Sequence, residues 1–99
     1  MPKVLHILLA DSAVTDLEEI REYYFEQQVP DVGDRLVREI IALIEGLSSH
    51  PDKGRVVPEF NQSKIRELIH PPFRIVYRRD SQGLSIVRVW RSERLMRLP

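Results

Sequence analysis

The fold of this chain is decided by residues 64–91, KIRELIHPPFRIVYRRDSQGLSIVRVWR, which hold three strand-like runs in succession. In the middle run, 73–79, apolar and polar side chains alternate, as they do in a strand whose two faces differ. The prolines at 71 and 72 end the first run, because proline cannot donate to a strand ladder. Residues 80–83 have the composition of a hairpin loop. We therefore expect an antiparallel meander of three strands, 64–70, 73–79 and 84–91.

The beginning of the chain predicts a strand followed by a helix. Residues 3–9 carry apolar side chains on both sides, which indicates a strand with both faces partly covered. Residues 13–28 have the spacing of an amphipathic helix, and Asp16 falls among the acidic side chains of its outer face. Asp11 or Ser12 can cap this helix, since either side-chain oxygen accepts from an unpaired backbone N–H.

A second helix is expected between residues 31 and 47, because Pro30 breaks the first helix and Asp31 can cap the next one. The short link between the two helices makes them a hairpin. Helices followed by a run of strands are typical of the α+β class. We therefore expect a single domain, residues 1–99, in which one small sheet packs on the helical hairpin.

Composition excludes several classes of protein. The chain contains no cysteine, which rules out disulfides, thiolate metal sites and a cysteine nucleophile. No apolar run approaches the roughly 20 residues that cross a bilayer, and the apolar start is too short for a signal peptide. These features predict a cytoplasmic protein without membrane contact.

Candidate catalytic groups do not converge in the sequence. The three histidines lie in different expected elements and lack metal-ligand spacing, and the carboxylates gather on one solvated helix face. Phosphate-binding loops and nucleophile elbows are absent as well. We therefore predict no metal, no cofactor and no conventional active site.

The charges are distributed unevenly along a chain whose formal net charge is zero. Residues 1–54 hold five Lys/Arg and eleven Asp/Glu (5 − 11 = −6), whereas residues 55–99 hold ten and four (10 − 4 = +6). Either the two halves neutralise each other in the fold, or they form faces with different partners. On the second interpretation the candidate target-binding residues are Arg66, Arg74, Arg78, Trp90, Arg91 and Arg94.

Five local sequences, taken in order, resemble toxins of the RelE/ParE superfamily. They are SAVTDLEEI at 12–20, LSSHPDKGR at 47–55, IREL at 65–68, FRIVYR at 73–78 and IVRV at 86–89. The resemblance covers nearly the whole chain. It implies the toxin component of a bacterial type II toxin–antitoxin system.

The superfamily has two branches, and the resemblance favours the ParE branch. RelE-like toxins are ribosome-dependent mRNA endonucleases that use basic residues and usually a C-terminal tyrosine, whereas ParE-like toxins lack that set and poison DNA gyrase. Arg66, and Arg91 or Arg94, fall near RelE basic positions, but Leu95 and Met96 stand where a tyrosine is usual. The chain also departs from the His-Gly-x-Arg ending of many ParE toxins, so only Arg94 is loosely comparable there.

The resemblance implies a ParD-like antitoxin, possible toxin–antitoxin hetero-oligomers, and gyrase as the target. Antitoxins of this family wrap the toxin with a C-terminal segment. The second helix has more apolar residues than one sheet requires, and Val37, Ile41 and Ile44 are either docking points or ordinary core. Two alternatives are a ribosome-dependent RNase using Arg66, Arg74 and Arg91, and a nontoxic binding module with the same fold. Residues 92–99 either pack on the domain or contact a partner.

Overall fold

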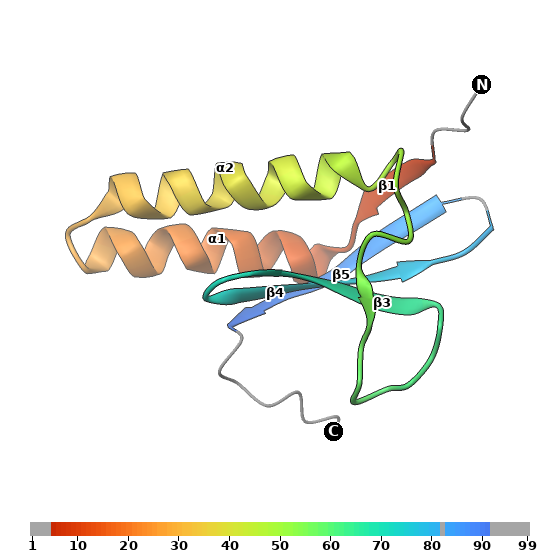
Figure 1. The fold of residues 1–99 in the computed structure, drawn as a ribbon. Helices are drawn as coiled ribbons and strands as arrows, with labels where there is room; N and C mark the ends of the chain where they lie inside the picture. The colour runs from red at the N-terminus through yellow and green to blue at the C-terminus, as the bar shows by residue number, and fades with distance from the viewer. Residues whose placement is uncertain (1–4, 82, 92–99) are drawn as a thin grey trace.

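In the computed structural model, which describes residues 5–81 and 83–91, a helical hairpin covers one face of a five-stranded sheet (Figure 1). The expected α+β class and the three-stranded meander are confirmed. The short strand β2 is an addition, because two residues are too few to show an alternating pattern. The elements are β1 His6–Leu9, α1 Asp11–Glu26, α2 Pro30–Gly46, β2 Arg55–Val56, β3 Ile65–His70, β4 Phe73–Arg79 and β5 Gly83–Arg91.

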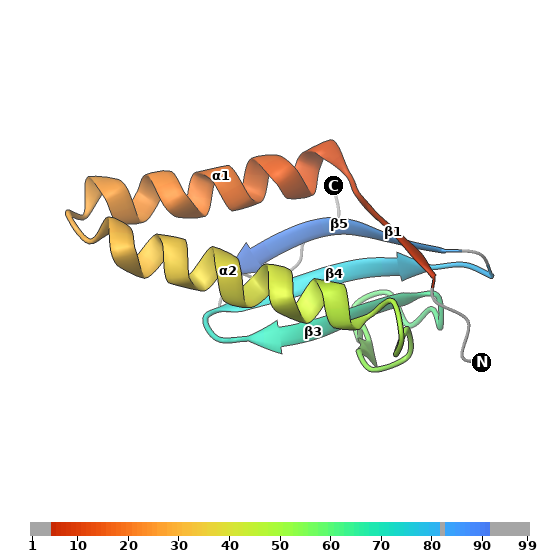
Figure 2. The same cartoon turned by 90° about the horizontal axis from the view of Figure 1, so that it is seen from above.

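The strands lie in the order β1-β5-β4-β3-β2, and only the β1–β5 pair is parallel. The helical hairpin supplies the crossover that a parallel pair needs. Seen from above, α1 runs alongside β5 (Figure 2). Strand β1 pairs with Gly83–Ile86 only, so the second half of β5 pairs with β4 on one side and, among the described residues, has no strand on the other.

The main core lies between the helical hairpin and the sheet. Both helices place buried side chains at intervals of three or four residues, the period that keeps them on one side of a helix. The side chains that they meet on the sheet include the apolar series of β4, as the alternation at 73–79 predicts. The core residues include Ala13, Leu17, Ile20, Leu36, Ile40, Ile44, Leu68, Phe73, Ile75, Tyr77, Leu84, Ile86 and Val89.

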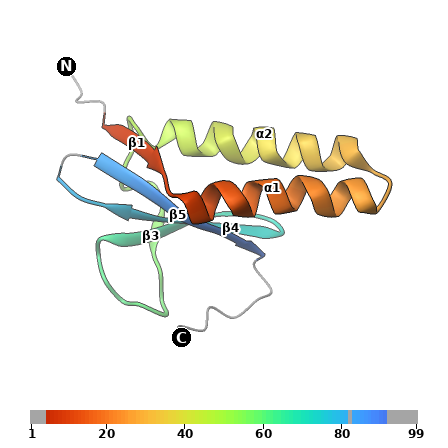
Figure 3. The ribbon, with the colours of Figure 1, turned by 180° about the vertical axis from the view of Figure 1, so that it is seen from behind.

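A smaller cluster covers the opposite face of the sheet. Val57 and Val76 are buried there, and Phe60 and Trp90 pack against them. The segment that follows β2 turns back across this face, whereas the helices lie on the other one (Figure 3). Strand β4 is therefore buried on both sides.

Three local expectations were wrong. Neither helix has a side-chain cap: α1 begins after Ala10, and α2 has Pro30 in its first turn. Pro30 already fixes a helical φ there and has no N–H that needs a partner. Strand β1 is mostly exposed, with Leu8 at 67%, because it lies at the sheet edge and has a neighbour on one side only.

A buried tyrosine fixes the loop before β2. The Tyr77 hydroxyl donates to the Pro51 carbonyl at 2.8 Å and accepts from the Gly54 amide at 2.9 Å. Burial is the main cause that raises the pKa of Tyr77 above its ordinary value. A Cβ at Gly54 would lie 2.6 Å from this hydroxyl and 2.7 Å from the Glu67 carbonyl oxygen. The loop therefore requires glycine at this position.

We expect Gly54→Ala to lower the free energy of unfolding by about 1–3 kcal/mol, the usual range for overpacking a filled site. The matched control is Gly46→Ala, because a Cβ at that helix end meets nothing within 4 Å. That variant should be neutral or stabilised by up to about 1 kcal/mol. Urea unfolding measures both changes, and equal midpoints for the two variants would contradict the role given to Gly54.

Candidate functional site

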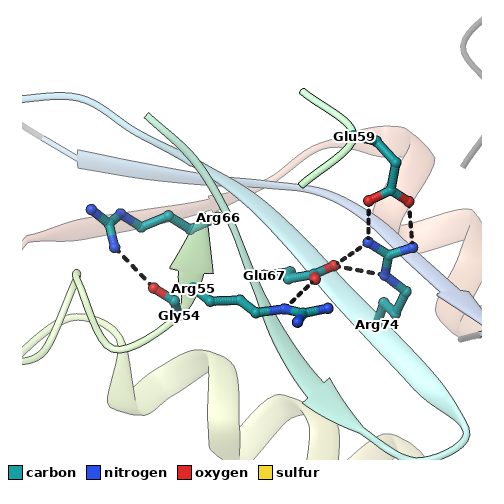
Figure 4. A network of polar contacts seen from close by, with 6 residues as sticks. All are labelled: Gly54, Arg55, Glu59, Arg66, Glu67 and Arg74. Atoms are coloured by element: carbon teal, nitrogen blue, oxygen red, sulfur yellow. Dashed lines mark hydrogen bonds and ion pairs between the residues drawn. The ribbon is translucent and has the colours of Figure 1, made fainter. Parts of the chain in front are cut away.

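A buried ion network lies on the sheet face opposite the helices (Figure 4). At its centre the fully buried carboxylate of Glu67 accepts from Arg55 Nε at 2.7 Å and from Arg74 at 2.6 Å. Arg74 also donates to both carboxylate oxygens of Glu59, at 2.8 and 3.0 Å. The network joins β2, β3, β4 and the segment that covers the smaller core. Its first task is therefore structural.

Arg74 is the predicted target-binding residue most affected by this arrangement. Its side chain is 8% exposed, and its guanidinium is engaged by two carboxylates. The hydrogen bond to Glu59 is the main cause that raises the pKa of Arg74, against the opposing effect of burial. Arg74 stays a prediction as a binding residue, but a partner would have to compete with both acids for it.

Arg66 is held at the loop that Tyr77 fixes. Its Nη1 donates to the Gly54 carbonyl at 3.0 Å, and its Nε donates to the Ser63 carbonyl at 3.1 Å. Asp52 lies 3.7 Å from the same Nε. Like Arg74, Arg66 thus uses guanidinium nitrogens to bind groups within the fold.

Polar side chains of α1 cover the edge of β5 that β1 leaves without a strand. Ser12 donates its hydroxyl to the Val87 carbonyl at 2.7 Å. The Asp16 carboxylate accepts the Val89 amide at 2.8 Å and two bonds from Arg88, at 2.8 and 2.9 Å. These side chains replace a neighbouring strand, because backbone groups of a buried edge need partners.

Asp16 is therefore not the solvated acid that the sequence predicted. It is 5% exposed, and its hydrogen bond is the main cause that raises the pKa of Arg88. The spacing of Asp16 from Ala13 and Ile20 carries a weak signal of this position, because residues three and four apart share a helix face. The same acid that closes the strand edge thus also fixes a basic side chain beside it.

Next to Asp16, α1 and the end of β5 enclose a hollow of about 200 Å³. We call it the α1–β5 hollow; its aromatic walls are Tyr23, Tyr24, Phe73 and Trp90. The Arg91 guanidinium carbon lies 5.7 Å from the ring centres of Tyr23 and of Phe73, and that of Arg88 lies 4.6 Å from the Trp90 ring. Such distances suit cation–π contacts. Two predicted residues, Trp90 and Arg91, meet here.

The remaining predicted target-binding residues lie apart from the hollow. Arg78 is exposed on the sheet face opposite the helices, in the alternation of β4 with Arg74 and Val76. Arg94 lies outside the described residues. The structure therefore separates the predicted arginines into a buried network, a loop anchor, an exposed side chain and one end of β5.

The predicted antitoxin-docking residues belong largely to the core. Ile44 is 4% exposed, and Val37 and Ile41 are half-buried and pack against the main core cluster. The surplus of apolar residues on α2 is thus used mainly by the fold. Only Val37 and Ile41 keep part of their surface for a partner.

The described part of the chain offers no group of three acidic, histidine or cysteine side chains that could hold a metal. His70 pairs with Glu39 of α2 at 3.0 Å, an arrangement of two groups rather than a ligand set. No helix among the residues that the structure describes is long and apolar enough to span a membrane.

Comparisons with known proteins agree with this architecture. The family model described as "ParE toxin of type II toxin-antitoxin system, parDE" matches residues 7–96. A solved structure from the chromosomal ParDE TA system of P. aeruginosa is similar with a TM-score of 0.77 and 22% identity, covering 92% of this chain and 99% of that one. At that identity the similarity shows the fold. Curated protein sequences give no match.

We expect Glu67→Gln to lower the free energy of unfolding by about 1.5–3 kcal/mol, because a neutral amide weakens the buried charge-assisted hydrogen bonds from Arg55 and Arg74. The control is Asp34→Asn, which removes the partner of Arg21 in an ion pair whose side chains are 62% and 44% exposed. That change should cost less than about 1 kcal/mol. Similar losses in a denaturant titration would argue against a structural role for the network.

Proposed function

Because the chain belongs to the ParE toxin family of type II toxin–antitoxin systems, we propose that it inhibits DNA gyrase by binding it and that a ParD-like antitoxin neutralises it. The observation that carries the proposal is the family match over residues 7–96. The cytoplasm follows as the compartment, since gyrase and its DNA lie there. Toxin and antitoxin would form a hetero-oligomer.

A binding mode suits the chemistry of the described side chains. Tyr77 is the only tyrosine on the meander, and its buried hydroxyl is used by the Pro51 carbonyl and the Gly54 amide. A general acid or base must reach the proton that it moves. A binding surface needs only accessible charge and apolar contact area.

We place the target surface at two parts of the sheet: Trp90 and Arg91 at the end of β5, and Arg78 on the face opposite the helices. Arg78 is exposed, and a permanently charged guanidinium suits phosphate groups or an acidic protein surface. Trp90 and Arg91 are residue types enriched at the centres of protein interfaces. Arg66 and Arg74 then act indirectly, by holding the loop and the strands on which this surface is built.

The contacts of the arginines give less support to the alternative function, that of a ribosome-dependent RNase. It would use Arg66, Arg74 and Arg91 to stabilise charge on a scissile phosphate. Arg66 is bound to the Gly54 and Ser63 carbonyls, and Arg74 is buried between two carboxylates. Both would have to leave these partners before they could meet a phosphate.

The test compares two reactions of the purified protein: gyrase supercoiling of relaxed plasmid, and mRNA cleavage on translating ribosomes. We expect inhibited supercoiling, accumulated cleaved plasmid and intact mRNA. Cuts in mRNA at fixed codon positions with gyrase unaffected would overturn the proposal. Activity in neither reaction would favour a nontoxic binding module.

A tyrosine variant separates binding from acid–base chemistry. Tyr77→Phe removes a buried hydroxyl and leaves two backbone groups unpaired, so the free energy of unfolding should fall by about 1–3 kcal/mol. Below its unfolding temperature the variant should inhibit gyrase as well as the unmodified chain. A folded variant whose activity falls by about 100-fold or more would instead assign the hydroxyl to catalysis.

A further inference from the structure

The α1–β5 hollow lies beside the edge of β5 that has no strand next to it once β1 has ended. Strand β1 stops at Leu9, and from Val87 onward α1 contributes side chains on that edge of β5, whereas β4 stays paired on the other. Beyond Asp16 the helix and the strand leave the hollow of about 200 Å³ between them. This volume is smaller than the roughly 300–1,000 Å³ of a small-molecule site. It suits one large side chain from a protein partner.

The walls of the hollow favour an apolar occupant. Ile20 is buried at its base, and the Tyr23 and Tyr24 rings meet edge to face with centres 5.0 Å apart. Tyr23 is 47% exposed, so a partner can still remove much aromatic surface from water. A side chain enclosed by such walls is typical of the few contacts that carry most of the affinity of an interface.

The charges beside the hollow indicate which residues of the partner should lie next to that side chain. Helix α1 exposes Glu19 on the side of the hollow, and Glu26, seven positions further on, shares that helix face; the exposed Glu18 and Glu22 lie on the side toward α2. Among the described residues, the ion pairs of α1 involve only Asp16 and Arg21. Glu19 lines the hollow, and its charge also helps to raise the pKa of Arg88. Arg88 and Arg91 also line the hollow, but Arg88 is paired with Asp16, and Arg91 lies over the Tyr23 and Phe73 rings. The exposed acids on the α1 side of the hollow attract a basic segment.

We propose that the α1–β5 hollow binds the antitoxin, through a large apolar or aromatic side chain in a segment that turns Lys or Arg toward the glutamates of α1. This inference rests on the proposed function and deepens it by naming the contact. It places the contact between α1 and β5 rather than on Val37 and Ile41 of α2. The partner segment is thus defined by a basic charge, which complements the acids of α1, and by one apolar side chain enclosed in the hollow.

The same contact accounts for neutralisation. Trp90 and Arg91 line the hollow, and both belong to the proposed target surface. A segment seated there covers them directly. Toxin bound to antitoxin then cannot present that end of β5 to gyrase, and no conformational change is required.

The first test measures the affinity of the toxin for the antitoxin encoded with it, by calorimetry. Tyr23→Ala removes a wall of the hollow and should weaken binding by about tenfold or more. Phe25→Ala is the matched control: it removes an aromatic ring of the same helix that is 70% exposed and does not line the hollow. It should change the affinity by less than about twofold. Equal affinities for the two variants would overturn the proposal.

The second test measures the charge contribution. A variant with Glu19→Gln and Glu26→Gln should bind about threefold more weakly at low salt, and the difference should shrink as salt screens the attraction. Glu45→Gln is the control, because this acid is exposed at the end of α2. Unchanged or tighter binding by the double variant would overturn the proposal that the antitoxin segment presents Lys or Arg to these acids.

The outcomes separate this inference from the proposed function. If the unmodified toxin fails to bind the antitoxin, the antitoxin part of the proposed function fails, and the docking site fails with it. If it binds and Tyr23→Ala binds equally well, only the docking site fails. A homodimer in sedimentation that Tyr23→Ala dissociates would make a second copy the occupant. Tighter antitoxin binding after removal of residues 92–99 would make the chain's own end the occupant. Either result would overturn the proposal.

Discussion

The carboxylate of Asp16 joins helix α1 to strand β5 just beyond the point where strand β1 stops pairing with β5. It accepts the Val89 amide and two bonds from Arg88 while only 5% exposed. A carboxylate buried without such partners would be strongly destabilising. The contact therefore fixes how the helix lies on the sheet, and with it the shape of the hollow that α1 and β5 enclose.

Glu67 has a similar role on the other face, where it holds Arg55 and Arg74. These two acids explain how a chain with a basic second half uses its arginines. Asp16 and Asp52, from the acidic half, neutralise Arg88 and Arg79 of the basic half. Ion pairs within the fold thus neutralise part of the charge asymmetry of the sequence. What is left for partners is a glutamate-rich helix face and a few basic side chains on the sheet.

Local periodicity predicted the α+β class, the helical hairpin and the alternating faces of residues 73–79, because each depends on residues close in sequence. The burial of Asp16 was only weakly indicated by its spacing from Ala13 and Ile20, since its partner Arg88 is 72 positions away. The two-residue strand β2 left no pattern, so the position and burial of the network around Glu67 could not be predicted from spacing. Arginine composition indicated a binding surface, but only tertiary contacts distinguish Arg74, which is enclosed, from Arg78, which is exposed.

Arg74 is held within the fold, whereas the proposed function assigns Arg78 to contact with the target, and the pair Arg74→Gln and Arg78→Gln tests this difference most directly. Thermal unfolding and gyrase supercoiling would be measured for both variants. We predict that Arg78→Gln keeps its stability within about 0.5 kcal/mol but inhibits gyrase more weakly. Arg74→Gln should lose stability by about 3 kcal/mol. A stable Arg74→Gln without activity, beside a fully active Arg78→Gln, would contradict the account.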